Sequence, residues 1–156
     1  MRHAWLAITL FLTGCGGFVS SANPCSVMED SKLSDFVKST VTKKDAVGPK
    51  SVGDETVSTC DIDFADGQWL TITSGRRNTP IDNAALATYS HKNDEWSAKY
   101  GFPVFYREGE QDLDAFPKPD RRVHLRMGKN VGQGYNGSFP ANVTDKLRAI
   151  LIAITQ

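Results

Sequence analysis

The sequence has no excess of charge of either sign, because its 156 residues contain 18 Lys and Arg, 18 Asp and Glu, and three His. A chain with this balance lacks the basic surface of a dedicated nucleic-acid-binding protein and the composition of a disordered acidic tail. Its 40% of hydrophobic residues is ordinary for a water-soluble globular protein. We therefore expect one folded domain, and no nucleic acid among its partners.

Long apolar runs are also lacking, since the run near the start, Ala4 to Leu12, has nine residues. A helix of that length rises about 13 to 14 Å, which is too short for a hydrocarbon core of roughly 30 Å. The run follows the basic start Met1-Arg2-His3 and precedes small residues. This order is typical of a secretory signal peptide rather than of a permanent membrane anchor.

The apolar run ends in Leu12-Thr13-Gly14-Cys15, which resembles the lipobox of bacterial lipoproteins. In that family the cysteine thiol receives a diacylglyceryl group, and a signal peptidase then cleaves the chain before the cysteine. The resemblance implies a signal peptide at residues 1–14 and an acylated Cys15 that anchors the protein in the lipid bilayer. Gly16 stands where an Asp typically retains such proteins in the inner membrane, so the periplasmic side of the outer membrane is favoured if the source has two membranes. The alternative is cleavage after Ala22, which would release the protein into the periplasm or medium.

Cysteine is scarce: the sequence has three, and an odd number leaves one cysteine without a partner for an intramolecular disulfide. With Cys15 assigned to the lipid, Cys25 and Cys60 remain, and in an oxidising cell envelope we expect them to form a disulfide. Neither belongs to a CxxC pattern, to a close Cys and His cluster or to a nucleophile motif. The sequence therefore predicts a structural bridge rather than metal ligands or a catalytic cysteine.

The hydrophobic periodicity after a flexible tether at residues 15–24 predicts a single α+β domain over residues 25–156. A mostly antiparallel sheet is expected to pack against two or three helices. Alternating residues predict strands at residues 56–64, 69–73, 103–107 and 121–127. Apolar residues at helical spacing predict helices at residues 27–40, at residues 79–100 and from Asn142 onward, the first of them opened by a capping box from Ser26 to Glu29. Charges, glycines and a proline predict a loop at residues 43–55.

Asn23-Pro24-Cys25-Ser26 at the start of a helix, Cys60 on a strand and a C-terminal helix form an order that resembles small uncharacterised bacterial lipoproteins with a PsbP-like fold. In this chain Asp61-Ile62 follows the strand cysteine, without the nearby Trp that is common in that group. The resemblance implies an α+β fold and a location in the envelope, and it implies no activity.

Arg122, His124 and Arg126 alternate with apolar residues, so we expect the three to share the outer face of one strand. Arg76 and Arg77 could join them, and such a surface could bind a carboxylate or a phosphate. The alternative is a solvated face that pairs with the nearby acidic run. That acidic run consists of Glu108, Glu110, Asp112 and Asp114. Its carboxylates could bind Ca²⁺, but a solvated loop is the simpler expectation.

The glycine-rich stretch Gly128 to Gly137 lacks the Gly-Lys-Ser/Thr ending of a P-loop and the glycine order of a dinucleotide-binding site. Its last part, Gly132 to Gly137, has the composition of a loop that contacts another protein, and we expect it to expose Tyr135 and Asn136.

Catalytic signatures are lacking as well, because there is no Gly-x-Ser-x-Gly and only His91 and His124 remain after processing. We therefore expect a non-enzymatic envelope lipoprotein without metal or cofactor, whose domain binds an envelope protein. One alternative is an immunity protein or inhibitor that uses the Gly132 to Gly137 loop against an envelope-acting toxin or a wall-degrading enzyme. The other is an envelope hydrolase that depends on the two histidines.

Overall fold

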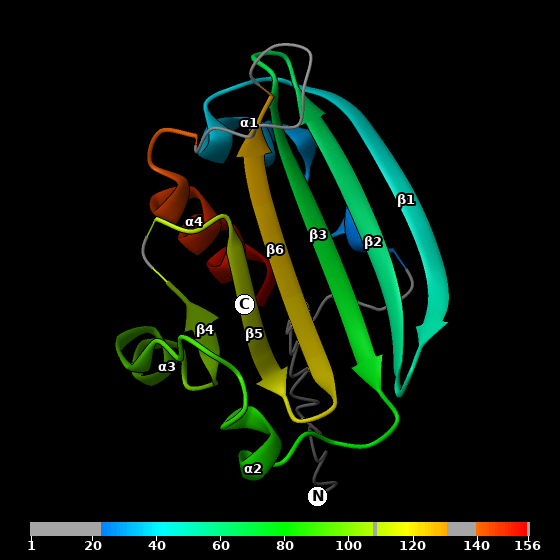
Figure 1. Cartoon of the computed structure of the whole chain (residues 1–156). Helices are drawn as coiled ribbons and strands as arrows, with labels where there is room; N and C mark the ends of the chain where they lie inside the picture. The colour runs from blue at the N-terminus through cyan, green and yellow to red at the C-terminus, as the bar shows by residue number, and fades with distance from the viewer. Residues whose placement is uncertain (1–22, 108, 131–139, 156) are drawn as a thin grey trace, which may run out of the picture.

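The computed structural model in Figure 1 describes residues 23–107, 109–130 and 140–155. They form an α+β domain around one six-stranded sheet in the order β1-β2-β3-β6-β5-β4, in which every neighbouring pair is antiparallel. The strands are β1 (Val41–Val52), β2 (Glu55–Phe64), β3 (Gln68–Arg77), β4 (Val104–Tyr106), β5 (Asp112–Lys118) and β6 (Arg121–Lys129). The helices are the 3₁₀ turn η1 (Pro24–Ser26) and α1 (Asp30–Val37), α2 (Asn83–Leu86), α3 (Asp94–Tyr100) and α4 (Val143–Thr155). The α+β class is thus confirmed, with more helices among the described residues than the two or three expected.

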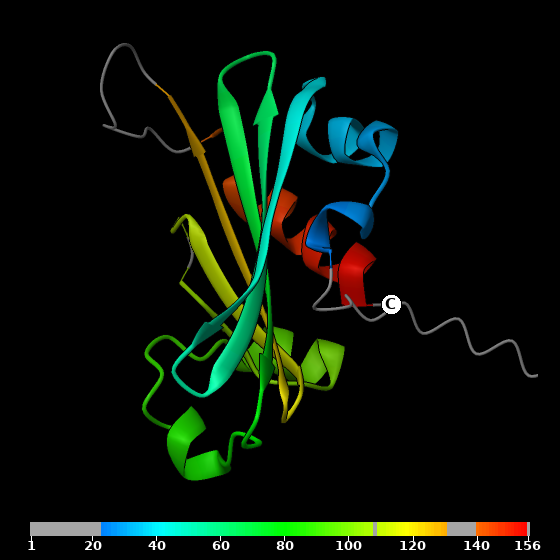
Figure 2. The ribbon, with the colours of Figure 1, turned by 90° about the vertical axis from the view of Figure 1, so that its right-hand side faces the viewer.

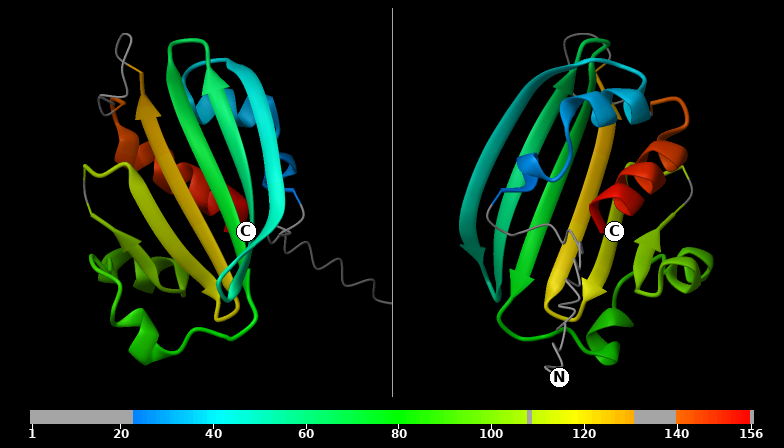
Figure 3. Two further views of the ribbon diagram at one scale, coloured as in Figure 1. Left: turned by 45° about the vertical axis from the view of Figure 1, so that its right-hand side comes forward. Right: turned by 180° about the vertical axis from the view of Figure 1, so that it is seen from behind.

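Helices α1 and α4 cover one face of the sheet, as the edge-on view in Figure 2 shows. Alternate residues of the strands point toward these helices and bury their side chains there. Leu70, Ile72 and Leu125 from the sheet meet Leu33 of α1 and Ile150 of α4 in this core, and each is at most 1% exposed. Among the described residues, no helix covers the opposite face of the sheet over β2, β3 and β6 (Figure 3).

The predicted loop at residues 43–55 is wrong, because β1 runs through most of it as an edge strand against β2. An edge strand has a neighbour on one side only, so Pro49 can sit there although it has no N–H to donate. A register shift between Val47 and Lys50 accommodates the Gly-Pro step. Gly48 has a φ of +111°, and a Cβ atom there would lie 2.8 Å from the carbonyl oxygen of Val57, so a residue with a side chain would not fit.

The first predicted helix is shorter than expected, and its capping box does not form. Helix α1 begins at Asp30, and Glu29 precedes it without a capping bond from its side chain. The Ser26 hydroxyl instead donates to the carbonyl oxygen of Asn23, while the Asn23 side chain accepts from the backbone N–H of Cys25 and caps η1.

The predicted helix at residues 79–100 is in fact two short helices, because its apolar residues belong to two different clusters. Ile81 and Tyr89, on either side of α2, pack with Phe105 and Phe116 on the face of the sheet away from α4. Trp96 of α3 packs into the main core on the other face. The chain changes face around the β4 edge, where His91 has a φ of +64° and Lys92 bridges to Phe105.

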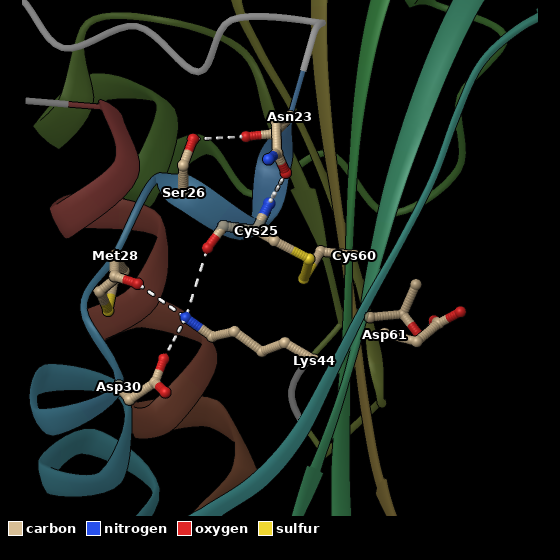
Figure 4. Close-up of a disulfide and its surroundings, with 9 residues drawn as sticks. Asn23, Cys25, Ser26, Met28, Asp30, Lys44, Cys60 and Asp61 are labelled. Atoms are coloured by element: carbon tan, nitrogen blue, oxygen red, sulfur yellow. Dashed lines mark hydrogen bonds and ion pairs between the residues drawn. A yellow bond between two sulfur atoms is a disulfide. The ribbon is translucent and has the colours of Figure 1, made fainter.

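The disulfide between Cys25 and Cys60 is present and joins η1 to β2 across a sequence separation of 35 residues (Figure 4). Lys44 of β1 supports the same corner, because its Nζ donates to the carbonyl oxygen of Met28 at 2.9 Å and lies 2.5 Å from the Asp30 carboxylate. The N-terminal end of the domain is thereby fixed to the covered face of the sheet.

Candidate functional site

The candidate site is the uncovered face of the sheet, which we call the open face (Figure 3). It carries the residues that alternate with the core residues of β2, β3, β6 and β5. In β6, Val123, Leu125 and Met127 are buried in the core. Arg122, His124 and Arg126 therefore point together to the open face, as their alternation predicts.

Each of these three side chains lies beside a carboxylate. Arg122 donates from Nε to Asp114 Oδ1 at 2.7 Å, and its Nη1 lies 3.5 Å from Oε2 of Glu55. Arg126 lies beside Asp112, with 3.4 Å between Nε and Oδ1. Arg122 is 27% exposed and its partners Asp114 and Glu55 are 20% and 12% exposed, so this part of the network is largely shielded from water. Arg122 and Arg126 are therefore already paired with carboxylates of neighbouring strands.

The strand pairing explains these contacts. In the register of β5 with β6, Asp112 lies opposite Arg126 and Asp114 lies opposite His124. Burial raises the pKa of the Asp114 carboxyl, but hydrogen bonds from His124 and Arg122, together with their charges, outweigh it and hold that pKa below its usual value. Burial lowers the pKa of Arg122, and its hydrogen bond and charge interaction with Asp114 more than reverse this. The network thus favours the charged forms of both groups.

Among the described residues, neither His91 nor His124 makes a hydrogen bond with a hydroxyl or a thiol. The two ring nitrogens of His124 face carboxylates, with Nδ1 3.2 Å from Asp114 Oδ1 and Nε2 3.5 Å from Asp112 Oδ1. Neither nitrogen is therefore aimed at a hydroxyl or thiol. His91 lies in the exposed turn before α3, on a different part of the fold from β6.

A groove with a volume of about 470 Å³ lies on the open face across β2, β3 and β6. Six of its lining residues are Asp61 and Asp63 of β2, Trp69 and Thr71 of β3, and His124 and Arg126 of β6. The indole of Trp69 rests on the backbone of β6, because a Cβ atom on Gly128 would lie 2.4 Å from its Cζ2. The guanidinium of Arg126 lies over this ring, 5.8 Å from its centroid.

Sequence reasoning placed two of these groove residues, His124 and Arg126, on an outer face and missed the other four as site residues. The signal was available in β2, since Cys60, Ile62 and Phe64 were expected on one face of that strand. The same alternation puts Asp61 and Asp63 on the opposite face. What was missing was the pairing of the strands, which brings these carboxylates into one groove with Trp69.

Several predicted residues do not join the groove. Arg77 lies at the end of β3 and pairs with Asp54 at 3.4 Å, and Arg76 alternates to the other face. Glu110 lies near Arg107 at 3.6 Å rather than in the network. Outside the described residues lie Cys15, Glu108, Tyr135, Asn136 and the Gly132 to Gly137 loop.

Among the described residues, no set of three or more His, Cys, Asp or Glu side chains is arranged to hold a metal ion. Within the same residues, no helix has the length and apolar character needed to cross a membrane.

Comparisons with known proteins add no relative to this picture. The chain matches no protein-family model, no curated protein and no solved structure at a significant level.

Proposed function

We propose that this chain is a lipid-anchored protein of the bacterial cell envelope, held in the bilayer by an acylated Cys15, and that its domain is a non-enzymatic binding module. The lipobox-like sequence and the Cys25–Cys60 disulfide support the envelope location. One observation carries the binding role: helices cover one face of the sheet, while the other presents a polar groove with a partly exposed tryptophan. Binding sites are commonly concave surfaces of this kind.

The anchor is tested by Cys15→Ser in cells that produce the full chain. Acyl transfer needs the thiol, so the variant is expected to lose incorporation of an alkyne-labelled fatty acid and to leave the membrane fraction. Gel fluorescence after labelling and fractionation measures both.

The matched control for the Cys15→Ser experiment is Ala22→Leu. This substitution disrupts the alternative cleavage site and leaves the lipobox intact. It should be labelled and membrane-bound like the natural sequence. Labelling that survives Cys15→Ser, or processing that is blocked by Ala22→Leu, would show that the protein is not a lipoprotein.

The binding role is tested by a photo-crosslinking phenylalanine analogue placed at Asp61 on the open face. Asp35 on the outer side of α1 is the control position, because it is also an exposed aspartate and its replacement removes the same charge. After irradiation of intact cells, we expect an envelope adduct from position 61 and none from position 35. Equal adducts from both positions, or none from either, would contradict a binding role for the open face.

A further inference from the structure

The groove of the open face has the size of a small-molecule cleft, since its volume of about 470 Å³ falls within the usual range of roughly 300 to 1,000 Å³. Ile62 and Leu70 border it, but their side chains point into the core and are 1% and 0% exposed. These two residues offer a ligand only backbone. The indole of Trp69 is therefore the main apolar surface of the described lining, and polar side chains surround it.

Trp69 is held in place by its neighbours. It lies opposite Gly128 in the register of β3 with β6, and the missing side chain of that glycine leaves room for the ring. The Arg126 guanidinium over the ring adds a cation–π contact. A fixed, partly exposed indole is a rigid apolar plate, and such a plate packs well against the C–H face of a pyranose ring.

Polar groups on the two sides of Trp69 still have hydrogen-bonding capacity. On β2, Asp61 accepts from the Thr71 hydroxyl at 2.7 Å through one carboxylate oxygen, and Asp63 makes no side-chain hydrogen bond or ion pair with the described residues. On β6, Arg126 faces Asp112 through Nε, which leaves its terminal nitrogens as donors. Acceptors and donors thus stand two strand spacings apart, about 10 Å. Sugar hydroxyls both donate and accept, so one glycan can bind both sides.

The charges of the groove decide between ligand classes. A phosphate or carboxylate would meet Asp61 and Asp63, while Arg126 of the described lining already shares its charge with Asp112. A cationic peptide would suit the two aspartates and could place a cation on the indole, but it would also meet the like charge of Arg126. We propose that the groove binds a neutral glycan whose sugar ring packs on Trp69 and whose hydroxyls bind the aspartates of β2 and Arg126 of β6. This inference rests on the proposed binding function and names the ligand class for the same face.

The test titrates the purified mature protein, residues 15–156, with three neutral oligosaccharides: chitotetraose, cellotetraose and maltotetraose. Trilysine and inorganic phosphate are the competing probes. Tryptophan fluorescence and calorimetry report binding. Residues 15–156 contain two tryptophans, and the fluorescence is informative because Trp96 is only 5% exposed. We expect at least one tetrasaccharide to bind and to change the emission, and neither trilysine nor phosphate to compete with it.

Two variants and one control locate the binding. Trp69→Ala should weaken tetrasaccharide binding at least tenfold, because it removes the plate. Asp63→Asn keeps the size of an exposed side chain and should weaken binding several-fold, so it tests the groove even if the tryptophan variant folds poorly. Asp35→Asn makes the same charge change on α1 and should leave binding unchanged.

Absence of binding by all three tetrasaccharides, or binding that Trp69→Ala and Asp63→Asn leave intact, would overturn the glycan assignment. Trilysine binding that depends on Asp63, whether or not it also depends on Trp69, would overturn it in favour of a cationic peptide. If no tetrasaccharide binds while the crosslink from position 61 forms in cells, the ligand class is wrong and the binding function stands. If that crosslink is also missing, both fail.

Discussion

Replacing Cys25 and Cys60 together with alanine is expected to lower the free energy of unfolding by about 3 to 4 kcal/mol, because the disulfide closes a loop with a sequence separation of 35 residues. The cross-link restricts the unfolded chain, which gains conformational freedom once the bond is removed. Cys60 is fully buried and Cys25 packs against the same core, so the bond lies within the packed structure. Urea unfolding of the oxidised protein and of the double variant, followed by circular dichroism, measures the difference.

The control for the disulfide is Cys15→Ser, which removes the third cysteine without touching the bridge. It should unfold at the same urea concentration as the natural sequence when both are measured in the same detergent. An unchanged midpoint for the Cys25 and Cys60 double variant would mean that the contacts around Lys44 hold this corner without the bond.

Arg122→Met is expected to destabilise the domain by about 2 to 3 kcal/mol at pH 7. The change keeps an apolar stem but leaves the carboxylates of Asp114 and Glu55 without their cation in a site largely shielded from water. Glu55 Oε1 is already buried without a hydrogen-bond partner among the described residues, which makes the loss of Arg122 more costly. Urea unfolding at several pH values measures the effect.

The pH dependence of this effect has a definite sign. The pKa of Asp114 is lowered in the folded protein, so its contribution to stability is present above the unfolded value of about 4 and is lost as the pH falls through the folded value. The deficit of Arg122→Met should therefore shrink as the pH is lowered toward 3. The control is Arg126→Met, whose ion pair with Asp112 is about half exposed and worth less than about 1 kcal/mol. Equal losses from the two variants, or a deficit that grows in acid, would contradict a buried Arg122–Asp114 pair.

The sequence predicted the elements whose local pattern agrees with their place in the fold. The hairpin of β2 and β3 and strand β6 alternate clearly, and the structure confirms them. Strand β1 was missed because Gly48, Pro49 and its charged residues disfavour a strand locally, while pairing with β2 stabilises one. The helix at residues 79–100 was predicted as continuous because spacing alone does not show that Tyr89 and Trp96 pack on opposite faces of the sheet.

The same division applies to the candidate site. Alternation placed Arg122, His124 and Arg126 on one face, but their partners depend on which strand lies beside β6. The β5 register sets Asp114 opposite His124, and no local pattern gives that alignment. The groove likewise depends on a pairing across strands, since Gly128 makes room for Trp69 from 59 positions away in the sequence.

Under the proposed lipid anchor, the layered arrangement also determines which face of the domain would lie toward the membrane. The described chain begins at Asn23, and the disulfide fixes this end on the side of α1 and α4 (Figures 2 and 4). Eight residue steps separate Cys15 from Asn23, so their Cα atoms lie at most about 29 Å apart in any conformation. A lipid on Cys15 would therefore keep the helix layer toward the bilayer. The groove would then point outward, toward the wall polymers and away from the lipid headgroups.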